Sequence, residues 1–165
     1  MKRICAWCKK ELEGGPLSSK KDTPISHGMC PECAFHIRAS MGMPLQEFLN
    51  GLNAPVVLVN GDGRVISANN DAQSLLGKSI ERINGFKGGE VFECEYSYLP
   101  EGCGNTVHCA GCTIRNMVMD TMKTKKSHVR ESAYLNHKTN GRIEFLISTE
   151  KVDEFAFLRI DEIRQ

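Results

Sequence analysis

The fold of this chain is decided by residues 56–77, which read VVLVNGDGRVISANNDAQSLLG. An apolar run at 56–59 is followed by the turn sequence Asn60-Gly61-Asp62-Gly63, and a second short apolar run then resumes. This pattern is typical of two strands joined by a tight turn. The polar residues at 69–71 are good N-caps for a short helix, and Gly77 is suited to end it. The segment therefore predicts a strand pair that runs into a helix.

Further strands and helices are predicted on both sides of this segment. Before it, Pro44 begins a short amphipathic helix whose apolar residues have helical spacing: Leu45, Phe48, Leu49 and Leu52. After it, a longer helix has one apolar face, formed by Ile114, Met117, Val118 and Met122. Three strands close the chain at 129–136, 142–149 and 155–163. This order predicts an α+β domain with a mixed antiparallel sheet and flanking helices.

The string of strand, NGDG turn, strand, Ala68-Asn69-Asn70, helix and Leu76-Gly77 resembles the PAS sensor fold. The resemblance covers roughly residues 45–163. It implies a domain that senses a ligand, a cofactor or a redox change and passes the result to a separate signalling partner.

The eight cysteines fall into two sets of four, and no cysteine is left over. The first set, Cys5, Cys8, Cys30 and Cys33, has the spacing C-x2-C-x21-C-x2-C. The second set, Cys94, Cys103, Cys109 and Cys112, has the spacing C-x8-C-x5-C-x2-C. A tetrahedral metal ion takes four thiolates, and both sulfurs of a Cys-x-x-Cys pair can reach one ion. The sequence therefore predicts two metal centres.

Residues 1–40 are interpreted as a zinc ribbon or knuckle. The stretch at 14–21 is polar and contains Gly and Pro, so the metal would have to hold this module together. His27 is a possible alternative ligand three residues before Cys30. The segments at 4–10 and 26–33 resemble a short cysteine module found beside PAS domains in bacterial signalling proteins. The role of this module is either docking of a partner or purely structural. Residues 1–40 contain seven Lys/Arg and four Asp/Glu, and this small charge excess favours protein docking or a structural role over nucleic-acid binding.

The second cysteine set lies where PAS domains have short helices that face the pocket. The segment at 94–112 resembles a cysteine-bearing PAS subgroup of bacterial sensory proteins, and its glycines at 102, 104 and 111 allow the backbone to curve round a centre. Four thiolates bind either zinc or an iron–sulfur cluster, and the spacing does not decide between them. A third interpretation is a reversible disulfide between Cys109 and Cys112. This interpretation leaves Cys94 and Cys103 unexplained.

Composition limits the function classes. The formal net charge is +1, and eight thiolates around two divalent ions would change it to −3, which argues against a strongly basic nucleic-acid binder. Neither a membrane span nor a secretory signal is expected, so we expect a cytoplasmic protein whose thiols stay reduced. No catalytic constellation is recognisable, and His108, His128 and His137 are expected to be solvated or hydrogen-bonded. An enzyme is therefore not expected.

The sequence predicts three parts: a four-cysteine zinc-binding module at 1–40, a connecting amphipathic helix at 41–53 and a PAS-like sensor domain at 54–165. The favoured function is a cytoplasmic sensor or adaptor that responds to redox state, oxygen or a ligand through the 94–112 centre. We expect it to be a homodimer through the helix from Pro44 and the outer face of the sheet. The alternative is an interaction or nucleic-acid-binding protein with two structural zinc sites.

Overall fold

The chain forms two compact units, Met1–Pro44 and Leu45–Gln165, in the computed structural model. The structure describes residues 2–12, 25–40, 42 and 44–165. The polar stretch at 14–21 lies outside the described residues. Each unit has its own sheet.

The first unit has a small three-stranded sheet with the order β2-β1-β3. Its elements are β1 (Lys2–Cys5), β2 (Glu11–Leu12), β3 (Ile25–Gly28) and helix α1 (Pro31–Ser40). Strand β1 pairs antiparallel with β2 and parallel with β3. Between β1 and β2 the chain turns back on itself through Lys9, which has a φ of 63° and donates its backbone N–H to the carbonyl of Cys5. The pairings bring the ends of β1 and β3 together, each beside a cysteine.

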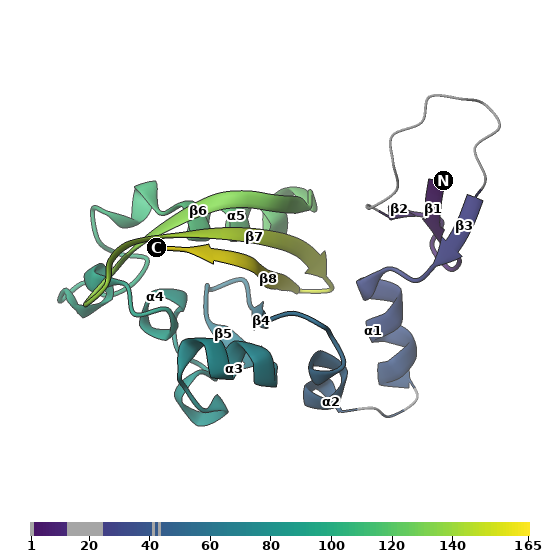
Figure 1. Ribbon diagram of the computed structural model, residues 1–165, viewed down its shortest axis with the longest axis horizontal. Helices are drawn as coiled ribbons and strands as arrows, with labels where there is room; N and C mark the ends of the chain where they lie inside the picture. Colours follow the sequence, from purple (N-terminus) through teal and green to yellow (C-terminus); the bar gives the residue numbers. More distant parts are fainter. Residues whose placement is uncertain (1, 13–24, 41, 43) are drawn as a thin grey trace. The chain divides into compact units, whose positions relative to one another are not determined.

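The second unit begins with helix α2 (Leu45–Asn50), and the strand pair β4 (Val56–Val59) and β5 (Val65–Ala68) follows it. Short helices come next: α3 (Asn70–Leu76), the 3₁₀ helix η1 (Ile80–Arg82), α4 (Gly88–Val91), and the 3₁₀ helices η2 (Glu95–Tyr98) and η3 (Cys109–Gly111). The chain ends with helix α5 (Thr113–Thr124) and the long strands β6 (His128–His137), β7 (Gly141–Val152) and β8 (Phe155–Arg164) (Figure 1).

The five strands form one sheet with the order β5-β4-β8-β7-β6, and its described pairings are all antiparallel. The predicted turn between β4 and β5 is present. The Asn60 side-chain oxygen accepts the backbone N–H groups of Asp62 and Arg64, and Gly63 has a φ of 78°. Because a residue with a side chain rarely adopts this φ, the glycine is required there. The predicted α+β class, with an antiparallel sheet and flanking helices, is confirmed.

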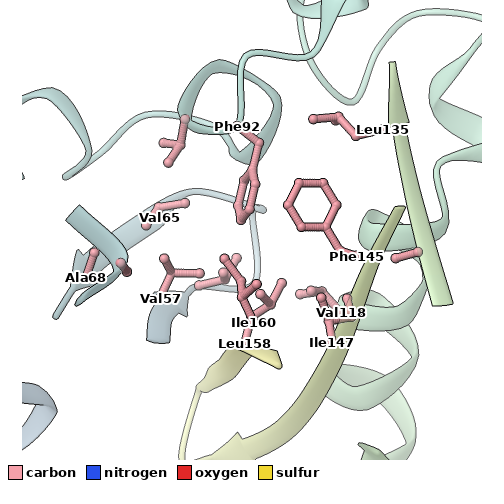
Figure 2. Packing of buried hydrophobic residues seen from close by; sticks show 14 of the residues in the cluster. Val57, Val65, Ala68, Phe92, Val118, Leu135, Phe145, Ile147, Leu158 and Ile160 are labelled. Atoms are coloured by element: carbon pink, nitrogen blue, oxygen red, sulfur yellow. The ribbon is translucent and has the colours of Figure 1, made fainter. Parts of the chain in front are cut away.

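The main core lies between one face of the sheet and the helices (Figure 2). Alternate residues of the strands point into it, as the two-residue period of a strand requires. Val57, Leu158 and Ile147 on three successive strands are at most 1% exposed. At the end nearer the cysteines, the rings of Phe92 and Phe145 meet edge to face with centroids 5.8 Å apart. The packed core therefore gives the loop after Phe92 a fixed starting point.

Helix α2 covers part of the other face of the sheet. Phe48 and Leu49 are buried, and the ring of Phe48 lies 6.2 Å from that of Phe157 on β8. The apolar side of the helix from Pro44 is thus used within its own unit. The homodimer expected through this helix stays a prediction, and Phe48 and Leu49 do not offer it a free apolar surface.

Asn69 ties α2, β4 and α3 together. Its side-chain oxygen accepts the backbone N–H of Ala72, as predicted for an N-cap, and also that of Val56, each at 3.0 Å. Its side-chain nitrogen donates to the carbonyls of Leu49 and Ala54. The side chain is 1% exposed, so these four bonds satisfy a polar group that would otherwise be costly to bury.

Candidate metal centres

The first set of cysteines converges in the N-terminal unit. The Sγ atoms of Cys5, Cys8, Cys30 and Cys33 all lie within 4.8 Å of one another, and those of Cys8 and Cys30 are 3.6 Å apart. A tetrahedral zinc with Zn–S bonds of about 2.3 Å separates its sulfurs by about 3.8 Å. The four thiols therefore have the spacing that one zinc ion needs. His27 lies in β3 opposite Ile4, but its side chain lies outside what the structure describes.

The backbone of this unit favours thiolates. Hydrogen bonds from the backbone N–H groups of Cys30 and Cys8 lower the pKa of Cys5 to about 6. Cys30 lies just before α1 and is buried, and this burial raises its pKa to about 12. Cys33 donates its backbone N–H to the Cys30 Sγ at 3.4 Å. A metal ion that replaces the proton of Cys30 would remove the cost of a buried, unpaired thiolate.

The second set of cysteines surrounds a cavity in the larger unit. Cys94 precedes η2, Cys103 lies in the following loop, Cys109 begins η3 and Cys112 is the N-cap of α5. All four line one cavity of about 430 Å³, together with residues of α4, α5 and β6. The structure therefore brings together the four thiols that the spacing grouped. All eight cysteines, each in the described part of the chain, are free thiols.

The sulfurs of the second set are more widely spread than those of the first. Among the described residues, the only group of three or more potential ligands whose atoms lie within 4.8 Å of one another is the N-terminal one. The four cavity thiols are thus too far apart to match the about 3.8 Å edge of a zinc tetrahedron. In an iron–sulfur cluster the four thiolates bind different irons or pairs of irons, so a wider arrangement is required. The geometry and the cavity volume fit a cluster.

The sulfurs of the second set accept hydrogen bonds from backbone N–H groups of the protein. Backbone N–H groups of Gly89, Gly104 and Arg115 donate to three of them at 3.1–3.4 Å; the acceptors are the Sγ atoms of Cys103, Cys109 and Cys112, respectively. Backbone N–H groups near the start of η2 also favour the thiolate of Cys94. Such N–H···S bonds stabilise cluster thiolates and influence their reduction potential. Each of the four sulfurs thus has at least one backbone donor that offsets the charge of a thiolate.

The thiol pKa values reflect both burial and mutual repulsion. Burial raises the pKa of Cys94 and of Cys103, and the charges of the other cavity cysteines add to the rise. Burial also acts on Cys109, but hydrogen bonds from Thr106 and Gly104 outweigh it and lower its pKa. Four thiolates cannot share this cavity without positive charge between them, which a bound metal centre would supply.

Gly89 allows Cys103 to approach α4. A Cβ placed on Gly89 would lie 2.7 Å from the Cys103 Sγ, a distance that real Cβ atoms essentially never show, and 3.1 Å from the Cys103 Cβ. At Gly111, a Cβ would have no described atom within 4 Å. Of these two glycines, only Gly89 is needed to leave room for a cysteine, Cys103.

Side chains also fix the cysteine loop to strand β6. The rings of Tyr96 and His108 stack with centroids 3.8 Å apart, and the Tyr96 hydroxyl accepts a hydrogen bond from Asn136 on β6. One residue before Cys94, the Glu93 carboxylate contacts Lys138 at 3.1 Å and His137 at 3.3 Å. These contacts anchor both arms of the loop to the same end of β6.

The remaining histidine expected to be hydrogen-bonded also has partners. His128 begins β6, and its ring lies 2.7 Å from the Asp120 carboxylate on α5 and 2.9 Å from that of Glu131. Burial opposes a charge on the ring, but the two carboxylates outweigh it and raise the pKa of His128. This group joins α5 to β6, away from the cysteines.

Sequence reasoning grouped the eight cysteines but missed the residues that support the second set. Gly89, Thr106, Tyr96 and Arg115 were not predicted. The one local signal was the pair Gly88-Gly89 at the start of a helix, where glycine is otherwise unfavourable. The others depend on contacts between segments that the sequence does not bring together.

No protein-family model matches the chain, and no curated protein sequence matches it. Solved structures do match. A domain of a sensory box sensor histidine kinase/response regulator from Geobacter sulfurreducens has a TM-score of 0.50 at 9% identity, with 78% of this chain and 95% of that chain covered. The PAS domain of a protein from Colwellia psychrerythraea has a TM-score of 0.48 at 15% identity, with coverages of 78% and 95%.

A third similar structure is the photoactive yellow protein domain from a sensor histidine kinase of Rhodospirillum centenum, with a TM-score of 0.48, 15% identity and coverages of 74% and 96%. Taken with the strand order, the likeness to the Geobacter domain shows that the larger unit has a PAS-like fold. None of the helices in the described residues is both long and apolar enough to cross a membrane.

Proposed function

We propose that this chain is a signal-transduction sensor whose PAS-like domain holds an iron–sulfur cluster on Cys94, Cys103, Cys109 and Cys112. In the proposal, the N-terminal unit holds one zinc ion and contributes structure or partner docking. The protein works in a reducing cytoplasm as a homodimer, has no catalytic activity of its own and acts through a separate signalling protein. The signal is redox state or oxygen, because an iron–sulfur cluster responds to both.

One observation carries the proposal: the two cysteine sets have different geometries. The N-terminal sulfurs are close enough for a single ion, whereas the cavity sulfurs are spread around about 430 Å³ and include no such close group among the described residues. A two-zinc protein would need the same compact tetrahedron at both places. The difference therefore supports zinc in one unit and a larger centre in the other.

The connections of the loop suggest how the centre is read. Cys112 caps α5, since its Sγ accepts the backbone N–H of Arg115, and helix α5 packs on the sheet through the buried Met117 and Val118. Cys94 lies at the other end of the loop, next to the end of β6. Four ligated cysteines hold the loop, η3 and the first turn of α5 together. Releasing them frees the loop and the cap of α5, a local two-state change that a partner can recognise.

Two single substitutions test the assignment with reciprocal controls. The protein is loaded anaerobically with iron, sulfide and zinc, and its metal, sulfide and visible absorption are measured. Cys103→Ser should lose iron, sulfide and colour but keep zinc. Cys8→Ser, at an exposed ligand of the other centre, should lose zinc but keep the cluster. A colourless wild-type protein with zinc in both units would overturn the sensor proposal and support the two-zinc alternative.

A further inference from the structure

Two cations converge on the cavity that the second cysteine set surrounds. Lys87 precedes α4 and Arg115 lies in the first turn of α5, and both line the cavity. Measured from the point where a Cβ on Gly104 would lie, the Lys87 Nζ and the Arg115 Nε are each 3.8 Å away. The backbone N–H of Gly104 in turn donates to the Sγ of Cys109 at 3.1 Å. The two charged groups therefore both lie near Gly104, which is hydrogen-bonded to a candidate ligand.

Neither cation has an acidic partner of its own among the described residues. No carboxylate oxygen in that part of the chain lies within 4.0 Å of the Lys87 ammonium or the Arg115 guanidinium. The Glu90 carboxylate accepts the backbone N–H of Lys87, and Asp62 lines the same cavity without pairing with either cation. Arg115 is exposed and Lys87 is partly buried, so both charges are available to a negatively charged centre in the cavity.

The four thiolates provide that negative charge. An iron–sulfur cluster with four cysteine ligands carries net negative charge, and each added electron increases it. A nearby cation stabilises the reduced state more than the oxidised state, because its attraction grows with the charge of the centre. Residues outside the ligand set can thus set how readily the centre accepts an electron.

We propose that the positive charges of Lys87 and Arg115 raise the reduction potential of the cluster held by the cavity cysteines. This inference rests on the proposed function and adds to it the residues that tune its response. Arg115 acts twice: its backbone N–H donates to the Cys112 Sγ, and its side-chain charge favours the thiolate of Cys109. Lys87 acts only through its charge, from the side of the cavity where α4 begins.

The test compares charge-neutral variants with the wild type under anaerobic conditions. Lys87→Gln, Arg115→Gln and the double variant are loaded with iron and sulfide, and the cluster is titrated with dithionite and redox dyes. One electron enters the cluster and no bond breaks. The double variant should accept the electron about tenfold less readily, which is a shift of about 59 mV to more negative potential. Each single variant should give part of this shift.

Two controls separate charge from other effects. Lys123→Gln removes the same charge from the exposed last turn of α5, outside the cavity, and should leave the potential unchanged. Arg115→Lys keeps the charge and should restore most of the wild-type potential. The single variants keep the measurement available if the double variant loses its cluster.

Each outcome has one meaning. Variants that hold a full cluster at the wild-type potential overturn this inference and leave the proposed function intact. A wild-type potential that falls on addition of inorganic phosphate, with no such response in the double variant, supports the inference, because an anion that neutralises the two cations then has the same effect as their removal. A wild-type protein that holds no iron and sulfide overturns the proposed function and this inference with it.

Discussion

Gly89→Ala adds a single methyl group where Cys103 approaches α4. The new Cβ would lie 2.7 Å from the Cys103 Sγ, whereas non-bonded carbon contacts are optimal at about 3.5–4.0 Å. The thiol must therefore move by about 1 Å, and its 3.2 Å hydrogen bond from the Gly89 N–H is then lost. Forcing a methyl group into a packed site costs about 1–3 kcal/mol, so the cluster should be bound at least about fivefold more weakly.

The same substitution should not weaken the cluster-free domain. Position 89 lies inside a short helix, where alanine is favoured over glycine by about 0.5–1 kcal/mol. In the absence of the cluster, the Cys103 sulfur is free to turn away from the methyl group, and the Cys103 Cβ, 3.1 Å away, needs to shift by only a few tenths of an ångström. We therefore expect an unchanged or slightly raised melting temperature for the cluster-free variant, together with faster loss of iron to a chelator from the loaded variant.

Gly111→Ala is the matched control, because its added methyl meets no described atom within 4 Å although it lies between two of the ligands. It should release iron at the wild-type rate. If Gly89→Ala releases iron no faster than this control, Cys103 is not held against α4 in the loaded protein, and the reasoning fails.

Three other predictions concern the first metal centre and the second unit's stability. Cys30→Ser should lose the zinc and expose the backbone amides of residues 25–40 to hydrogen exchange, while exchange at residues 56–68 stays slow. Unchanged exchange in both segments would show that the fold of the N-terminal unit does not depend on the metal. Asn69→Ala should lower the free energy of unfolding, measured by urea titration, by about 2–4 kcal/mol, because it removes a helix cap and leaves buried backbone groups unpaired. Asn70→Ala, at the exposed neighbouring position, is the control in the same titration. The raised pKa of His128 means that its ion pairs contribute fully below about pH 6.5, the ordinary pKa of histidine, and that this contribution disappears as the pH rises through the higher folded-state pKa. His128→Gln should flatten that part of the stability–pH curve, and an unchanged curve would show that the ring does not titrate in this way.

The fold was predictable because its signals are local. The turn at 60–63 depends on hydrogen bonds of Asn60 to residues two and four positions later, and the capping bond of Asn69 reaches three residues ahead. The other bonds of Asn69, with Leu49, Ala54 and Val56, join segments 13–20 residues apart, and no local pattern indicates them. For the same reason, the sequence indicated that α2 is amphipathic but not that its apolar side packs on β8.

The sequence was sufficient to predict the ligands of the candidate site but not the distances between their sulfur atoms. Regular spacing groups four cysteines, and both sets share the terminal Cys-x-x-Cys. The separation of the cavity sulfurs depends on where η2, η3 and α5 lie, and tertiary packing determines these positions. Lys87 and Gly89 reach the site from α4, and a long stretch of chain separates them from Cys112. Their part in the centre is a property of the folded domain.

Elemental analysis of the wild-type protein, purified without oxygen, distinguishes a zinc-plus-cluster protein from a two-zinc protein. Zinc, iron and acid-labile sulfide are measured per chain in the same sample. We expect one zinc per chain together with iron and sulfide in equal amounts. Two zinc ions per chain with no sulfide would contradict this expectation.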